Sequence, residues 1–135
     1  MDIKITFPGG KRVNAEIEGM TIATDQSVKN GGDGSAPEPF KYFLASIGTC
    51  AGIYVLSFCQ KNGIPTEGIT LTQHHEYAND PSGKPYMAKL AININVPGSF
   101  PEKYHDAIVR VADQCAVKKA IMSPPEFVVR TVVGD

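Results

Sequence analysis

One uncharged stretch dominates the sequence, because residues 42–60 read YFLASIGTCAGIYVLSFCQ without a single charged side chain. At nineteen residues, the stretch is nearly long enough to cross a bilayer. Several hydroxyl and amide side chains lower its hydropathy, namely those of Ser46, Thr49, Ser57 and Gln60. We therefore expect a helix inside a soluble protein and no membrane span.

The stretch belongs to one long predicted helix with two recognisable ends. Pro39 suits the first helical position, where its missing N–H is not needed, and Gly63 suits the position just past the end. An alternative start has Ser35 as the cap and Glu38 as its partner. That start would place Pro39 at a fourth helical position, where proline removes a backbone hydrogen bond. We predict that the helix begins at Pro39 and runs to about Asn62.

The predicted helix is apolar on nearly every side, so most of its surface needs cover. The sheet of one 135-residue chain covers only part of such a helix, and a second subunit is the simplest further cover. Ala45, Gly48 and Gly52 fall on one side and would let another backbone approach closely. These features favour an obligate dimer. The alternative is a core helix with a tight crossing inside one subunit.

Strand patterns surround this helix. Apolar residues at alternate positions predict three strands before it, near residues 3–7, 13–17 and 20–23. Two further strands are expected after it, near residues 69–77 and 86–96. A turn-rich segment over residues 79–85 joins this second pair.

The C-terminal part is expected to hold two helices and a strand. The first helix starts at Ser99 or Pro101, and its apolar positions recur at helical spacing, at Tyr104, Ile108, Val111 and Cys115. A short helix over 117–122 and a β-branched strand over 127–133 follow. The predicted order is βββ-α-ββ-α-α-β, an α+β fold in a single domain over residues 1–135.

Composition limits the function. The net charge of −1 offers no basic excess for nucleic-acid binding, and three cysteines are too few for a disulfide scaffold. The N-terminus, MDIKITFPGG, alternates and then turns, so we expect no secretory signal and a cytoplasmic protein with reduced thiols. His74 and His75 would face opposite sides of a strand, and Glu102 with His105 lacks a second half-site, so no metal is expected.

The three cysteines differ in their predicted positions. Cys50 and Cys59 are nine residues apart in the helix, which places them on opposite faces and about 13–14 Å apart along the axis, too far for a disulfide. If the two longer helices cross, Cys50 and Cys115 are the pair that could meet. Each cysteine also has a simpler interpretation as a small apolar core residue, and Cys59 is expected to serve only that purpose.

Residues 39–50, PFKYFLASIGTC, followed by an apolar stretch to Asn62, resemble the central-helix signature of the OsmC/Ohr family. This family comprises osmotically inducible and organic hydroperoxide resistance proteins. The resemblance extends to the glycine-rich loop at residues 31–33 and to residues 114–117, QCAV, and it covers nearly the whole chain. It implies an intertwined homodimer with two buried central helices wrapped by sheets from both subunits.

The resemblance also implies a reaction. Cys50 would be the peroxidatic thiolate that attacks an organic hydroperoxide and becomes a sulfenic acid, and Cys115 would resolve it as a disulfide. An external dithiol, such as a lipoyl protein, would reduce that disulfide. No metal, flavin or other cofactor is implied. The expected partners are the chain itself, the hydroperoxide and the dithiol reductant.

The family activates its cysteine with an arginine held by a glutamate. Arg12 is the best match to the arginine, and Glu38 would be its partner, because the glutamate position of the family holds Lys41. We therefore expect a thiol peroxidase in oxidative stress defence. The alternatives are a non-enzymatic dimer of the same fold that binds a small apolar or thiol ligand, or a redox sensor.

Overall fold

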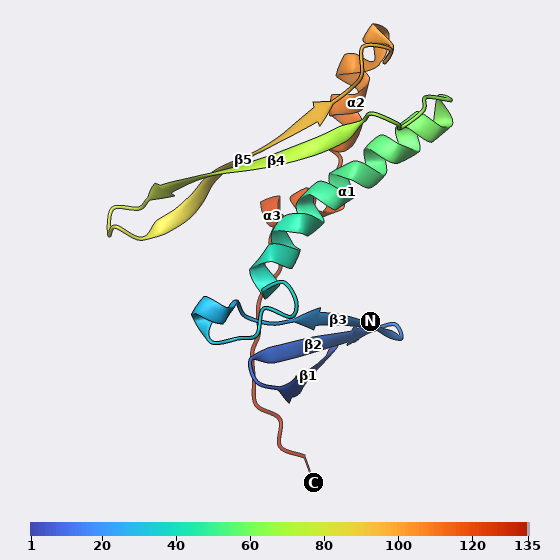
Figure 1. Ribbon diagram of the computed structural model, residues 1–135. Coiled ribbons are helices and arrows are strands. Elements are labelled where there is room, and N and C mark those ends of the chain that lie inside the picture. Colours follow the sequence, from blue (N-terminus) through green and yellow to red (C-terminus); the bar gives the residue numbers. More distant parts are fainter. Residues whose placement is uncertain (135) are drawn as a thin grey trace. The chain divides into compact units, whose positions relative to one another are not determined.

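The computed structural model describes residues 1–134 and has the predicted α+β architecture, with two antiparallel sheets and three α-helices (Figure 1). The chain forms two compact units, residues 1–46 and residue 47 to the C-terminal end. The order of elements confirms the predicted sequence of strands and helices up to the third helix. The expected last strand is the exception.

The N-terminal unit contains a three-stranded meander of β1 (Lys4–Gly9), β2 (Arg12–Ile17) and β3 (Met20–Thr24). Cross-strand pairing aligns Ile5 with Ala15, and Ala15 with Ile22, so the predicted apolar positions share one face. That face is open, since Ile5 and Ile22 are exposed and Phe7 is 80% exposed.

A loop after β3 is built around one buried carboxylate. Asp25 accepts hydrogen bonds from the backbone N–H groups of Gln26, Asp33 and Ser35 and from the Ser35 hydroxyl. Gly32 is required where the loop folds back, because a Cβ there would lie 2.1 Å from the Gln26 carbonyl oxygen. The glycine-rich segment is therefore a compact structural loop. It includes the short 3₁₀ helix η1 (Val28–Asn30).

Helix α1 (Pro39–Lys61) begins at the predicted proline and ends one residue before the predicted Asn62. Gly63 adopts a left-handed φ of 65°, and the Ile64 N–H closes the end on the Cys59 carbonyl oxygen at 2.8 Å. By length and composition, α1 is the one helix among the described residues that could cross a membrane, a test that core helices of soluble proteins also pass.

The single chain covers one side of α1 only. Its buried side chains recur every fourth residue, at Ile47, Ala51, Val55 and Cys59. Another line, which includes Thr49, Ile53 and Ser57, is exposed. Of the two glycines predicted to allow close approach, Gly48 faces Gln73 of the same unit, whereas a Cβ at Gly52 would meet no atom within 4 Å.

In the C-terminal unit, the antiparallel hairpin of β4 (Thr70–Asn79) and β5 (Pro85–Asn95) is followed by α2 (His105–Ala112), with the 3₁₀ turn η2 (Glu102–Tyr104) before it. Val55 and Cys59 from α1 pack with Phe100 and Ile108 to form the core. Partly buried apolar side chains of both strands pack against this core, which fixes α1 and α2 relative to the hairpin.

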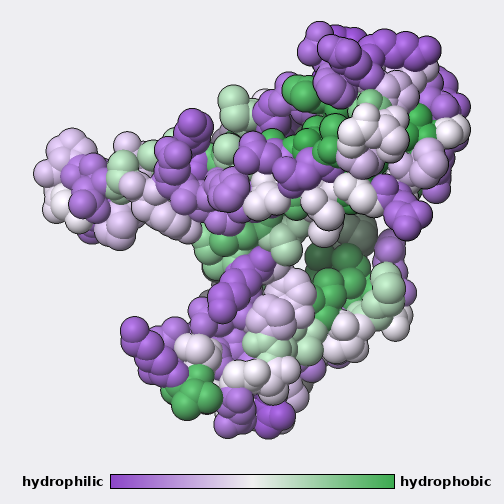
Figure 2. Space-filling view, turned by 45° about the horizontal axis from the view of Figure 1, so that its top comes forward, coloured by the Kyte–Doolittle hydropathy of each residue, from purple (hydrophilic) through white to green (hydrophobic). Residues whose placement is uncertain are grey.

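Two predictions about the C-terminal part are wrong. The second helix ends at Ala112, so Cys115 does not lie on it but in the connection to α3 (Ala116–Met122). Residues 127–133 form no strand, because no neighbouring strand pairs with them within the described residues. Phe127, Val129 and Val133 are accordingly more than four-fifths exposed. Figure 2 shows hydrophobic residues, in green, at several places on the surface.

Candidate functional site

The structure brings Cys50 and Cys115 together. Cys50 lies in the middle of α1 and is half-buried, and Cys115 precedes α3 and is 2% exposed. Their side chains interact, because each thiol shifts the pKa of the other. Both cysteines are free thiols, as is Cys59. The predicted encounter of Cys50 with the distant Cys115 is thus formed in the fold.

Cys115 is held by the backbone on two sides. Its sulfur accepts a hydrogen bond from the Lys118 N–H at 3.4 Å and so caps the N-terminus of α3. Its S–H group reaches the carbonyl oxygen of Ile47 on α1 at 3.7 Å. These contacts anchor the start of α3 beside the central helix.

The surroundings of Cys50 favour its thiolate. The backbone N–H of Val117 contributes most to a lowered pKa, followed by the Cys115 thiol and, more weakly, the Ala116 N–H, while burial opposes the shift. Such donors stabilise an anionic sulfur without a charged side chain. The sequence predicted a cation, Arg12, as the group that lowers the pKa of Cys50, and it did not predict these N–H groups. The available signal was the short helix predicted directly after Cys115.

Cys115 has the opposite tendency. Burial raises the pKa of its thiol, and the neighbouring Cys50 adds to that increase, although the Lys118 N–H works against it. Of the two thiols, Cys50 is therefore the more readily deprotonated. The arrangement favours Cys50 over Cys115 as the nucleophile.

Cys59 is separate from this pair. It is fully buried among Val55, Phe100 and Ile108, and burial raises the pKa of its thiol. Both observations confirm its predicted role as a packing residue.

The predicted activating residues lie in the N-terminal unit. The Arg12 side chain donates to the Gly9 carbonyl oxygen at 3.3 Å, and the Glu38 carboxylate accepts from the Ser27 N–H at 3.3 Å. No ion pair joins Arg12 to Glu38 within residues 1–134. Lys41 is exposed in the first turn of α1. A role for Arg12 or Glu38 at the thiols stays a prediction.

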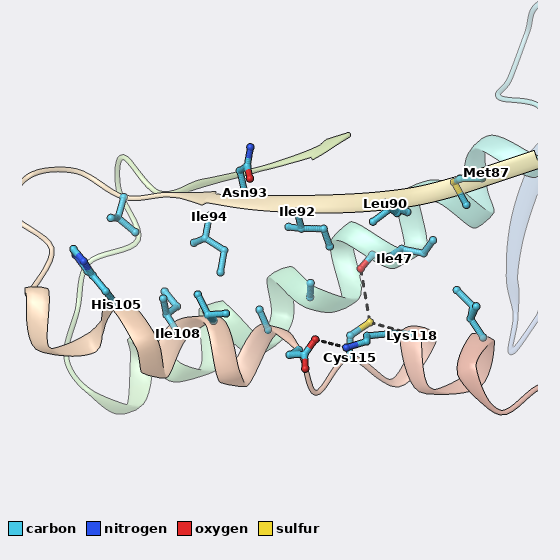
Figure 3. A pocket seen from close by; sticks show the side chains of 16 residues that line it. Ile47, Met87, Leu90, Ile92, Asn93, Ile94, His105, Ile108, Cys115 and Lys118 are labelled. Atoms are coloured by element: carbon cyan, nitrogen blue, oxygen red, sulfur yellow. Dashed lines mark hydrogen bonds and ion pairs between the residues drawn. The ribbon is translucent and has the colours of Figure 1, made fainter. Parts of the chain in front are cut away.

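An apolar cavity of about 720 Å³ opens beside the thiol pair, within the C-terminal unit. Figure 3 shows Ile92 and Ile94 projecting from β5 toward the helices, with Ile108 and Cys115 opposite them. Lys118 and Asp113 form an ion pair at its wall. Cys115 lines the cavity, and Cys50 is not among its lining residues. Among the described residues, no group of three His, Cys, Asp or Glu side chains could hold a metal.

Comparison with known proteins places this geometry in a family. The family model described as OsmC-like protein matches residues 32–130, which include both members of the thiol pair. A search of the curated proteins found no match.

Solved structures share the fold at low sequence identity. A candidate osmotic stress induced and detoxification response protein from Psychrobacter arcticus 273-4 has a TM-score of 0.69 and 24% identity, covering 87% of this chain and 85% of its own. The organic hydroperoxide resistance protein OsmC of Legionella pneumophila has a TM-score of 0.54 and 20% identity, and the match covers 90% of this chain and 89% of that protein. An organic hydroperoxide resistance protein from Elizabethkingia anophelis has a TM-score of 0.60 and 18% identity, and the match covers 92% of this chain and 90% of that protein.

Proposed function

Because the chain belongs to the OsmC-like family, we propose that it is a thiol-dependent peroxidase that reduces organic hydroperoxides in oxidative stress defence. The pairing of Cys50 with Cys115 is the observation that carries this proposal, since it brings a thiol of lowered pKa to one whose pKa is raised. The names of the structures from Legionella and Elizabethkingia, which refer to hydroperoxide resistance, support the substrate class.

The proposed reaction uses the two sulfurs in turn. The Cys50 thiolate attacks one peroxide oxygen, the O–O bond breaks, and the alkoxide takes up a proton and leaves as an alcohol. Cys50 is then a sulfenic acid. The Cys115 sulfur attacks it, and the departing hydroxide combines with the Cys115 proton to leave as water. An external dithiol reduces the resulting disulfide and returns both thiols.

The protein is proposed to act as a homodimer in the cytoplasm. The open face of the first sheet and residues 127–133 expose apolar side chains, and the exposed line of α1 carries no charge, so a second copy would cover all three surfaces. The cytoplasm suits the proposed reaction, because thiols stay reduced there. Arg12, with Glu38 as its partner, is proposed as an additional stabiliser of the Cys50 thiolate.

Peroxide consumption by three matched variants tests the proposed activity. The reduced protein is mixed with cumene hydroperoxide and a dithiol, and Cys50→Ser, Cys115→Ser and Cys59→Ser are compared with the unmodified chain. We expect Cys50→Ser to abolish turnover and Cys115→Ser to accumulate a sulfenic acid. Cys59→Ser should keep most activity. Absence of turnover together with absence of a Cys50–Cys115 disulfide by mass spectrometry would refute the proposal.

A non-enzymatic role is the second candidate. The apolar cavity and the presence of Lys41 at the glutamate position favour a protein that binds a small apolar or thiol ligand. A protein of this kind would bind such a ligand without consuming peroxide. Formation of the disulfide by peroxide without turnover in the presence of dithiols would instead identify a redox sensor.

A further inference from the structure

Three backbone N–H groups at the start of α3 have sulfur atoms as their acceptors. The Lys118 N–H donates to the Cys115 sulfur at 3.4 Å. The N–H groups of Ala116 and Val117 donate to the Cys50 sulfur. The two cysteines therefore hold the first turn of α3 in addition to forming the candidate redox pair.

Among the described residues, little else holds α3. The helix has seven residues, none of them is buried, and only Val117 is half-buried. A helix of this length is not stable on its own in water. Its first turn has no acidic residue to offset the helix dipole, so an anionic Cys50 is the favourable charge at this end. The order of α3 therefore depends on the chemical state of the two sulfurs.

We propose that α3 responds to oxidation, being ordered while Cys50 and Cys115 are thiols and frayed once they form a disulfide. The inference rests on the proposed function for its disulfide, and it adds a conformational change to that reaction. Two thiols and one hydroperoxide give the disulfide, an alcohol and water, so the peroxide is the oxidant and the thiol pair supplies both electrons.

Disulfide formation removes or weakens each contact at the start of α3. A disulfide sulfur carries no proton, so the hydrogen bond from Cys115 to the Ile47 carbonyl oxygen, 3.7 Å long in the thiol state, is lost (Figure 3). It also carries no negative charge, so Cys50 becomes a weak acceptor for the N–H groups of Val117 and Ala116. The covalent bond still ties residue 115 to α1. The helix therefore frays while the chain stays attached.

Amide hydrogen exchange measured by NMR tests this response. The Lys119 N–H bonds to the Cys115 carbonyl oxygen at 3.1 Å, and the Ser123 N–H bonds to the Lys119 carbonyl oxygen at 3.0 Å. These two amides report on the helix itself, because their acceptors are not sulfur atoms. The disulfide is prepared with diamide, so the experiment does not require peroxide turnover.

We expect both amides to exchange about tenfold faster in the oxidised protein, because a helix cap and a favourable charge at the helix start are lost together. Amides of β4 and β5 should exchange equally in the two states, since the hairpin does not depend on the sulfurs. Equal exchange of the Lys119 and Ser123 amides in the oxidised and reduced proteins would overturn the proposal.

A fixed charge at the start of α3 tests the cause. Ala116→Asp places a permanent anion at the exposed first position of α3, where it favours the helix in either redox state. Ala116→Asn has nearly the same shape without the charge and is the matched control. We expect Ala116→Asp to remove most of the difference between the oxidised and reduced proteins and Ala116→Asn to retain it. An equal difference in the two variants would overturn the role assigned to the sulfur charge.

The results separate this inference from the proposed function. Faster exchange in α3 of the diamide-oxidised protein, together with no consumption of peroxide, would support the response of α3 and refute the peroxidase. Peroxide turnover with unchanged exchange in α3 would do the reverse. Failure of diamide to form the Cys50–Cys115 disulfide would overturn the inference.

Discussion

The three thiols of this chain should titrate in a defined order, because their surroundings differ. Backbone N–H groups and the Cys115 thiol lower the pKa of Cys50, whereas burial raises the pKa of Cys59 and of Cys115. We predict that alkylation by iodoacetamide rises with pH at Cys50 first. Mass spectrometry of samples alkylated between pH 5 and 10 would measure this order. Equal midpoints for Cys50 and Cys59 would contradict the prediction.

Asp25 is a buried carboxylic acid whose ionisation bears on stability. Its hydrogen bonds to Ser35, Gln26 and Asp33 lower its pKa from 3.8 to about 2. Since the folded-state pKa is below the unfolded value, the stabilisation is complete above about pH 4 and is lost as pH falls toward 2. We predict that Asp25→Asn destabilises the protein at pH 7 and that the difference shrinks toward pH 2.

Urea unfolding at pH 7, 4, 3 and 2 measures this effect. Asp2→Asn, at an exposed N-terminal position, is the matched control and should change stability little at any of these pH values. A difference between Asp25→Asn and the native chain that stayed constant down to pH 2 would show that the Asp25 carboxylate is not linked to folding in this way.

Among the elements, α3 depends on Cys115 for its start. This helix has seven residues, none of them buried and none acidic in its first turn, and its cap is the hydrogen bond from the Lys118 N–H to the Cys115 sulfur. A serine at position 115 can accept the same bond, and an alanine cannot. We predict that Cys115→Ala lowers the free energy of unfolding by about 1 kcal/mol relative to Cys115→Ser.

Hydrogen exchange gives a local measurement of the same prediction. The amides of residues 116–122 should exchange faster in Cys115→Ala than in Cys115→Ser, while those of β4 and β5 should be unchanged. The alkylation midpoint of Cys50 should also rise in Cys115→Ala, since α3 presents its N–H groups less well. Equal exchange in the two variants would show that the cap does not order α3.

The sequence predicted α1 well and the thiol site in part. Proline and glycine mark the ends of α1 through local backbone chemistry, so residues 39 and 63 sufficed to place them. The helical repeat through Tyr104 and Ile108 did not predict where α2 stops, because Cys115 leaves the helix to cap α3. The N–H groups that favour the Cys50 thiolate come from this break in regular structure. The short helix predicted directly after Cys115 was the available signal for such backbone donors.

For the whole molecule, a β pattern is not sufficient to form a strand. Residues 127–133 have the β-branched composition of a strand, and their apolar side chains are exposed, with Val129 96% exposed. A strand forms only when another strand supplies its hydrogen bonds, and β1 and β3 each have an edge without a partner in their sheet. In the proposed homodimer, a second copy would supply the partner for this segment and the cover for α1.

Dissociation by a single charge tests the proposed homodimer. Ile53 lies on the exposed line of α1 and is 53% exposed in the single chain. If that line stays in solvent, Ile53→Asp should change stability by no more than about 0.5 kcal/mol. If a second α1 covers it, the buried carboxylate has no partner and should cost several kcal/mol of dimer stability. We predict a dimer for the native chain and a monomer, or an unfolded chain, for Ile53→Asp.

Sedimentation equilibrium over a range of protein concentrations measures the mass directly. The native chain should give twice its monomer mass of 14.5 kDa. Ile53→Val, which keeps a β-branched apolar side chain, is the matched control and should remain dimeric. A native chain that is monomeric at all concentrations and an Ile53→Asp variant of unchanged stability would together refute the dimer. Because Cys50 and Cys115 belong to one chain, their contact does not require a partner, so a monomeric result would leave the thiol pair intact and remove only the proposed cover of α1.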